Sequence, residues 1–144
     1  MRVSSKGDYG VRALVELAHH YGEGPLQSSE IAARQQIPEP YLDQLLTSLR
    51  RAGFVRSTRG PQGGHQLARE PGEMRLSDVI VALEGSMAPI GCLENEAGCP
   101  KSNGCTQRVV WEEVHQATTA ILERTTIGAL AEKERAATGA MYYI

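Results

Sequence analysis

The 144-residue sequence predicts a mainly α-helical fold with one small β-hairpin, and three observations support this expectation. A short helical pattern near residue 28 is followed, after a break, by a longer one over residues 40–52, the order of a helix-turn-helix. Two strand-like segments then flank a Gly/Pro-rich turn, as in the wing of a winged helix. A long amphipathic pattern covers residues 109–122. We therefore expect a winged helix-turn-helix domain plus a long C-terminal dimerisation helix.

The helices of the first half are recognised by their end signals. Apolar side chains recur at helical spacing over residues 8–21, which predicts the first helix. Ser28 or Ser29 is expected to cap the short second helix. Pro40 suits the first turn of the third helix, where its missing N–H costs nothing, and Gly53 is expected to end that helix.

The hairpin and the next helix follow directly along the chain. Residues 54–57 and 65–68 are the predicted strands, and residues 59–64 form the tip of the wing. Ser77 is expected to cap the helix that comes after the hairpin, and Gly85 is expected to end it.

The long helix has no core left to cover once the winged helix is complete. Its apolar stripe should therefore pack against a second subunit, which predicts a homodimer. Thr126 is expected to cap a short last helix. The predicted segments are a winged helix-turn-helix domain over 1–85, a cysteine loop over 86–106, a dimerisation helix over 107–125 and a C-terminal extension over 126–144.

The composition indicates a soluble globular protein, with 41% hydrophobic residues, 22% charged residues and a net charge of −2. No apolar run approaches the roughly 20 residues that a membrane-spanning helix needs. The first residues also lack the apolar stretch of a secretory signal. We therefore expect a cytoplasmic protein without a membrane partner, whose cysteines are reduced thiols.

A basic stretch contrasts with this near-neutral total charge. Residues 50–69 include five arginines and one histidine but no acidic residue. A local basic face suits a protein that contacts phosphate with one surface. Alternatively, the arginines form a solvated face and the fold binds another protein. The order of helix-turn-helix and wing favours double-stranded DNA as the partner.

In a helix-turn-helix, the N-terminal residues of the second helix reach base edges in the major groove. At these positions Asp43 can accept from cytosine and Gln44 can pair with adenine. Arg59 on the wing can enter a minor groove or hold a phosphate. The predicted DNA-binding residues are Lys6, Ser28, Ser29, Glu39, Tyr41, Asp43, Gln44, Arg50, Arg59 and His65, the last as a phosphate contact.

Three cysteines, Cys92, Cys99 and Cys105, occupy one loop-like segment, with six and then five residues between neighbours. The CxxC knuckle that is usual in zinc sites is absent. Thiolates at wider spacing among Gly and Pro residues suit an iron–sulfur cluster, with one coordination position left for another ligand. A thiol–disulfide switch and buried structural thiols remain the alternatives.

Four stretches together resemble the IscR/NsrR family, the iron–sulfur-dependent winged-helix transcriptional regulators of bacteria. They are residues 1–9, residues 41–46, the wing at 55–64, and residues 76–80 followed by the three cysteines. The resemblance covers about residues 1–125. It implies a dimer whose long helices cross, a cluster bound by the cysteine loop, and DNA binding that depends on the state of the cluster.

The resemblance also assigns residues to operator recognition. By position, Asp43, Gln44 and Arg59 match residues that the family uses for this purpose. Pro40 stands where the IscR branch often has Ser, so that hydroxyl contact is missing.

The fourth cluster ligand separates the branches of the family. IscR-like members place a His three residues after the third cysteine, where this chain has Arg108, which cannot coordinate. NsrR-like members can use an Asp near the start of the first helix of the other subunit, and this chain has Asp8 there. The resemblance thus favours the NsrR-like branch and a [4Fe–4S] cluster with Asp8 as ligand, with [2Fe–2S] as the alternative. Asp8 can also be an ordinary acid at a helix N-terminus.

The leading hypothesis is a DNA-binding transcriptional regulator, a repressor on a palindromic operator, that senses nitric oxide, oxidative or iron–sulfur status. The first alternative is a cluster-free regulator with a thiol switch. The second is an electron-transfer iron–sulfur protein. The sequence contains no nucleotide-binding loop and no nucleophile–base pair, so we do not expect an enzyme.

Overall fold

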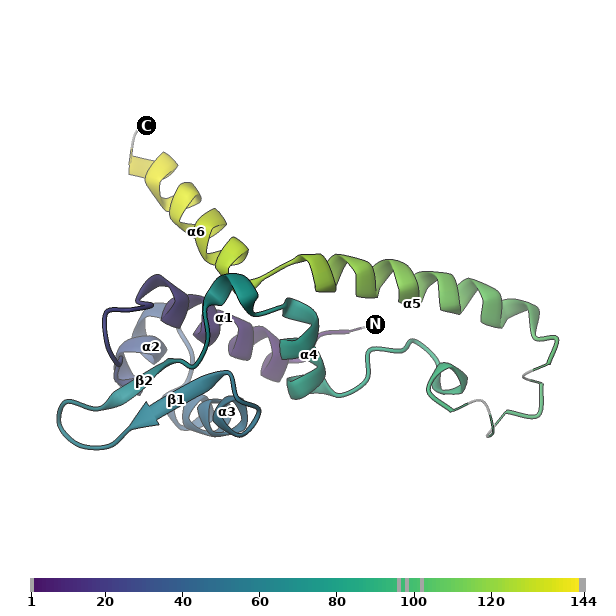
Figure 1. The fold of residues 1–144 in the computed structure, drawn as a ribbon, viewed down its shortest axis with the longest axis horizontal. Coiled ribbons are helices and arrows are strands. Elements are labelled where there is room, and N and C mark those ends of the chain that lie inside the picture. The colour runs from purple at the N-terminus through teal and green to yellow at the C-terminus, as the bar shows by residue number, and fades with distance from the viewer. Residues whose placement is uncertain (1, 96, 98, 102, 143–144) are drawn as a thin grey trace.

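The computed structural model describes residues 2–95, 97, 99–101 and 103–142, and it is mainly α-helical with one two-stranded sheet (Figure 1). This confirms the fold class predicted from the sequence. The elements in chain order are α1 Ser5–His19, α2 Ser28–Gln35, α3 Glu39–Arg51, β1 Val55–Thr58, β2 Gly64–Leu67, the 3₁₀ turns Pro71–Glu73 (η1) and Gly91–Leu93 (η2), α4 Leu76–Glu84, α5 Thr106–Arg124 and α6 Ile127–Tyr142.

Helix α1 lies at the centre of a body formed by α1–α4, the hairpin and α6, and it packs against α2, α3, α4 and α6. Removal of the apolar faces of these helices from water is the main stabilising contribution to this body. The third helix contributes a leucine at each inward position of its turns, as its apolar pattern predicts. The largest fully buried side chains are Leu14, Ile31, Leu42, Leu45, Leu46, Leu49, Leu67, Met74, Ile127 and Val79.

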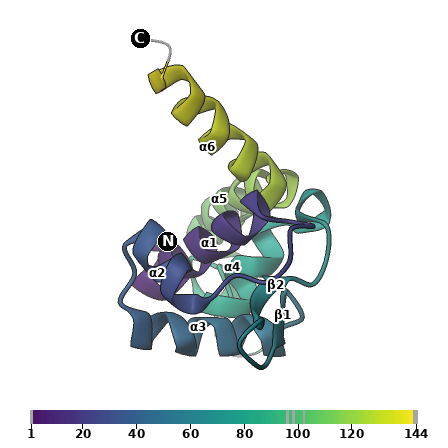
Figure 2. The ribbon, with the colours of Figure 1, turned by 90° about the vertical axis from the view of Figure 1, so that its left-hand side faces the viewer.

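Helix α3 and the hairpin lie along one face of this body, and α6 lies on the opposite side (Figures 1 and 2). The two strands pair antiparallel, from Val55 opposite Leu67 to Thr58 opposite Gly64. Pro40 is in the first turn of α3 as expected, and Gly53 follows its C-cap with a φ of 88°. The helix-turn-helix and its wing therefore have the predicted order and share a surface.

Two expected serine caps are wrong. Helix α2 begins at Ser28 itself, with Gln27 as N-cap, because the side chain of Gln27 bonds the hairpin and its carbonyl accepts from the first turn. Helix α4 begins at Leu76, one residue before Ser77. The amide of Leu76 already donates to the carbonyl of Thr125 at 2.8 Å, so it needs no serine cap.

Helix α6 is longer than the short last helix that the sequence predicts. Thr126 caps it as expected, since its Oγ1 accepts from the amide of Ala129 at 3.0 Å. The side chains of Ile127 and Ala131 lie in the core against the rest of the body. The expected extension over 126–144 therefore begins inside the packed body, and residues 143–144 are outside the described part.

Helix α5 is the contrasting element, because none of its 19 residues is buried. It extends away from the body beside the cysteine segment (Figure 1). Within the described residues, no helix is both long enough and apolar enough to span a membrane. The exposed large hydrophobic side chains of α5 are Val109, Val110, Trp111, Val114 and Ile121.

Candidate DNA interface and cysteine segment

Helix α3 presents polar side chains outward while its leucines pack inward. Glu39, Asp43 and Gln44 are exposed at its N-terminal half. Tyr41 is only half-buried and meets the ring of Tyr9 edge-on, with 5.7 Å between the ring centres. Three of the predicted base-reading positions are thus free to reach a partner, while Tyr41 also joins α3 to α1.

The wing brings further predicted residues beside α3. Arg59 is exposed at the wing tip, and Arg50 is exposed near the end of α3. Strand β1 packs against α3, and the charges of Asp43 and Arg50 on α3 influence the pKa of His65 on β2. The structure thus gathers acidic, amide and basic side chains of α3 and the wing on one surface.

His65 differs from the expected phosphate contact in its surroundings. Its ring is half-buried, and Nδ1 is hydrogen-bonded to Ser57 Oγ at 2.7 Å across the hairpin. Burial lowers the pKa of His65, Asp43 raises it and Arg50 lowers it, with burial the largest influence. Burial of the ring therefore disfavours the positive charge that a contact with phosphate would use.

The remaining predicted DNA contacts lie outside this cluster. Lys6 is exposed in the first turn of α1 and close to Glu84, whose pKa it helps to lower. Ser28 is half-buried and Ser29 is exposed, both at the start of α2. Of these, only the α2 serines belong to the helix-turn-helix itself.

The three cysteines lie in the segment between α4 and α5, and all are half-buried free thiols. Cys92 is in the 3₁₀ turn η2, and Cys105 is the residue before α5. Three thiols in one segment are the donor set that iron–sulfur clusters use. Among the described residues, no group of three or more His, Cys, Asp or Glu side chains is gathered at one point. The donor chemistry therefore fits a cluster, although the described residues do not themselves form a complete set of ligands.

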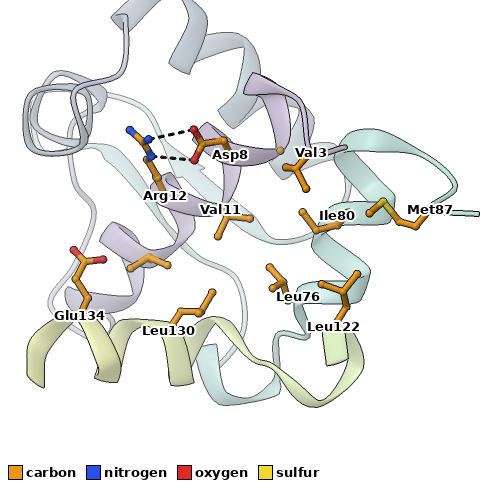
Figure 3. A pocket seen from close by; sticks show the side chains of 12 residues that line it. Val3, Asp8, Val11, Arg12, Leu76, Ile80, Met87, Leu122, Leu130 and Glu134 are labelled. Atoms are coloured by element: carbon orange, nitrogen blue, oxygen red, sulfur yellow. Dashed lines mark hydrogen bonds and ion pairs between the residues drawn. The ribbon is translucent and has the colours of Figure 1, made fainter. Parts of the chain in front are cut away.

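Asp8 is on the outer side of α1 and paired with an arginine one turn along. Arg12 donates from Nε and Nη2 to the two carboxylate oxygens of Asp8, each at 3.1 Å (Figure 3). Arg12 Nη1 also approaches the carbonyl of Gln35, the last residue of α2, at 3.4 Å. Its guanidinium lies over the ring of Tyr9, 5.4 Å from the centre. Arg12 thus links Asp8 to α2 directly. It links Asp8 to α3 through Tyr9, whose ring meets that of Tyr41.

Asp8 and Arg12 also line a groove of about 620 Å³ between α1, α4, α6 and the end of α5. Figure 3 shows apolar side chains around the rest of this groove, among them Val11, Ile80 and Leu122. The groove therefore combines an acid, its counter-ion and an apolar wall on one accessible side of α1.

Sequence reasoning missed two residues that organise these surfaces. Arg12 stands four residues after Asp8, a helical ion-pair spacing that the sequence already contained. Glu84 accepts hydrogen bonds from Ser4 and from the amide of Gly7, at the start of α1. The partners of Glu84 are far away in the sequence, so no local signal could identify it.

A helix-turn-helix, a hairpin wing beside it and a long exposed helix define the class of winged-helix regulators. A profile of the Rrf2 family, described as an iron-dependent transcriptional regulator, matches residues 3–133. The chain belongs to this family, so the predicted resemblance to IscR/NsrR-type regulators is confirmed at the level of the family, and the NsrR-like branch stays a prediction.

Individual relatives agree with this assignment. The HTH-type transcriptional regulator CymR of Bacillus subtilis is 38% identical over 131 residues, which cover 91% of this chain and 90% of that protein. The solved structure of T. potens IscR is 40% identical with a TM-score of 0.78, covering 99% of this chain and 97% of that one. The oxidized form of Staphylococcus aureus CymR is 35% identical with a TM-score of 0.73, covering 92% and 97%. CymR and IscR are regulators by name, not enzymes.

Proposed function

We propose that this transcriptional regulator binds duplex DNA as a homodimer and responds to an iron–sulfur cluster held by Cys92, Cys99 and Cys105. The observation that carries the proposal is the position of three free thiols between the DNA-reading body and an exposed helix, in a family described as iron-dependent. A bound cluster would supply a redox-active centre whose ligation can change there. Its reactivity would make the protein a sensor of nitric oxide or oxidative status.

The two-fold pair is supported by the unpartnered apolar surface of α5. Exposed large apolar side chains recur along this helix, and contiguous apolar patches on soluble proteins mark interaction sites. A dimer presents two copies of α3, which suits a palindromic operator with the same two-fold symmetry. Occupation of such an operator by the dimer is the basis of the proposed repressor role.

Asp8 is the proposed fourth ligand, contributed by the other subunit. Its carboxylate is at the surface and paired with Arg12, so it can exchange one partner for another. When Asp8 is engaged elsewhere, Arg12 loses its bidentate partner and keeps its approach to Gln35 and its position over Tyr9. Arg12 is therefore the route by which the state of Asp8 can alter α2 and, through Tyr9 and Tyr41, α3.

Anaerobic purification followed by iron and acid-labile sulfide analysis tests the cluster. We expect iron and sulfide in equal amounts, as in [4Fe–4S] and [2Fe–2S] clusters, with absorption separating the two. Protein without iron contradicts the proposal.

A paired substitution tests the fourth ligand. We expect Asp8→Ala to shift the cluster spectrum or shorten its lifetime in air, because a ligand is removed. Asp78→Ala is the matched control, since Asp78 is also an exposed acid in the first turn of a helix. An Asp8→Ala spectrum and lifetime equal to those of the control remove Asp8 from the ligand set.

A cluster-free thiol switch is the second candidate function. A solved relative is an oxidized form of CymR, and the described residues of this chain do not gather a metal-binding group. If the protein is a thiol switch, we expect it to contain no iron. Reversible oxidation of its free thiols should then alter DNA binding. Thiol counting alongside the iron analysis distinguishes the two regulators.

A further inference from the structure

The wing is held from outside by the segment that joins α1 to α2. Leu26 and His65 exchange both backbone hydrogen bonds, at 2.8 and 2.7 Å, so Leu26 is paired with β2 as a third strand would be. The next residue, Gln27, donates from its side-chain Nε2 to the carbonyl of Gly63 at 2.7 Å. We call residues 26–27 the wing brace.

Two glycines are required here, Gly64 by the close approach of the brace to the wing and Gly63 by the tight turn within the wing. A Cβ at Gly64 would collide with the carbonyl oxygen of Leu26, and the φ of Gly64 is 147°. A Cβ at Gly63 would collide with the carbonyl of Thr58 on the opposite strand. The amide of Gly63 also closes the tip by donating to the carbonyl of Gly60 at 2.9 Å. The Gln27 side chain thus holds the turn that carries Arg59.

Gln27 also starts the helix-turn-helix. It is the N-cap of α2, and its carbonyl accepts from the amides of Glu30 and Ile31 at 3.1 and 3.3 Å. One residue therefore fixes the first helix of the motif with its backbone and the wing tip with its side chain. A displacement of α2 is transmitted to the wing through this residue.

We propose that Gln27 is a positioning residue for DNA recognition, which fixes the wing tip and Arg59 relative to the helix-turn-helix. This inference rests on the proposed DNA binding but not on the cluster. Without the Gln27 amide, the backbone pair of Leu26 and His65 still anchors β2, while the turn from Gly60 to Gly63 loses its external hydrogen bond. Arg59 must then be ordered during binding, which weakens affinity.

A double-mutant cycle with Arg59 separates positioning from general structure. Gln27→Met keeps the length of the side chain but removes its donor, and Arg59→Ala removes the group that is positioned. The probe is a duplex selected with the parent protein from a random-sequence library. We expect Gln27→Met to weaken binding about three- to ten-fold, the range for one lost net hydrogen bond. In the Arg59→Ala background, the same change should have almost no effect.

The controls address folding and charge. Melting temperatures of all variants are compared first, and Gln116→Met on α5 makes the same chemical change at an exposed position far from the wing. Should Gln27→Met fold poorly, Gln27→Glu enters the same cycle, because an ionised Glu cannot donate and an acid is favourable at a helix N-terminus. Repulsion between its added charge and the DNA acts in both backgrounds and cancels in the coupling. Because an attraction to Arg59 would not cancel, the neutral Gln27→Leu enters the cycle as well.

The coupling decides the proposal. A loss of affinity that is larger in the parent background than in the Arg59→Ala background supports positioning of the wing. An equal or larger loss in the Arg59→Ala background, or no loss in the parent background, overturns it. If the parent protein selects no duplex, the DNA-binding function itself fails, and this inference fails with it.

Discussion

The body and the arm of this protein differ in how much of their apolar surface is buried within one chain. In the body, formed by α1–α4, the hairpin and α6, apolar faces meet in a common core. In the arm, residues 86–125, none of the described residues is buried, and α5 exposes a run of large apolar side chains. The helix-turn-helix and its wing are therefore packed within one chain, whereas the described part of the cysteine-bearing arm leaves its apolar side chains exposed.

This difference assigns separate tasks to the two regions. A body with a rigid core can hold α3 and the wing in a fixed relation, as recognition of a duplex requires. An arm that exposes its apolar side chains can change when a ligand or a second subunit binds it. Glu84, at the end of α4 and next to the arm in sequence, accepts from the start of α1, and Arg12 links Asp8 on the same helix to α2.

The largest expected effect is in the arm. Replacement of Cys99 by Ser should reduce bound iron to background, because it removes a thiolate ligand and leaves at most two. The melting temperature of the cluster-free body should not change, since Cys99 is outside its core. Iron analysis and thermal unfolding measure the two results, with Asn103→Ala in the same segment as control. Full iron content in Cys99→Ser contradicts the ligand assignment.

A pair of alanine substitutions compares the regions directly. Leu46→Ala in the body should lower the free energy of unfolding by about 2–5 kcal/mol, because it leaves a cavity in a packed core. Val110→Ala in the arm should change it by about 0.5 kcal/mol or less at protein concentrations where the chain is monomeric. Urea denaturation provides both values. Equal losses in the free energy of unfolding would contradict the difference in packing between body and arm.

The proposed dimer surface offers a sharper test of the arm. Val114→Asp places a charge in the middle of the exposed apolar stripe of α5. We expect the dimer dissociation constant to rise more than about ten-fold, equivalent to roughly 1.4 kcal/mol, while the body keeps its stability. Sedimentation equilibrium measures association, and Glu113→Gln, an exposed neighbour, serves as control. Unchanged association would exclude this stripe from the interface.

The smallest effect concerns the junction of the two regions. Hydrogen bonds from Ser4 lower the pKa of the Glu84 carboxyl, so its ionised form is stabilised in the folded state. This contribution is present at neutral pH and is lost as the pH falls below about 4.5 and through the lowered pKa. Glu84→Gln should therefore lose less stability between pH 7 and pH 3.5 than the parent, by denaturant titration. Glu73→Gln, a control on an exposed acid, should behave as the parent.

Much of the body could be predicted from sequence because its signals are local. Apolar spacing located α1 and α3, Gly53 and Pro40 bounded α3, and glycines marked the wing. The expected cap at Ser28 or Ser29 was wrong because the neighbouring Gln27 is the N-cap of α2. The expected cap at Ser77 was wrong because α4 begins one residue earlier, where the amide of Leu76 donates to the distant Thr125.

Less of the candidate site could be predicted from the sequence. Residue types and spacing singled out the cysteines and the outer residues of α3. The links through Gln27, Glu84 and Tyr41 depend on partners brought together only by the fold. The half-buried position of His65, bonded to Leu26 and Ser57, likewise depends on contacts made only in the fold.

The most direct test measures duplex affinity on one anaerobic sample before and after removal of its iron. We expect the iron-loaded and iron-free forms to differ in affinity by about 5- to 150-fold, the range of typical coupling between two sites. Such a difference would show that the state of the cysteine segment affects binding at the DNA-reading surface. Protein that contains no iron when prepared without oxygen, or equal affinities of the two forms, would contradict that connection.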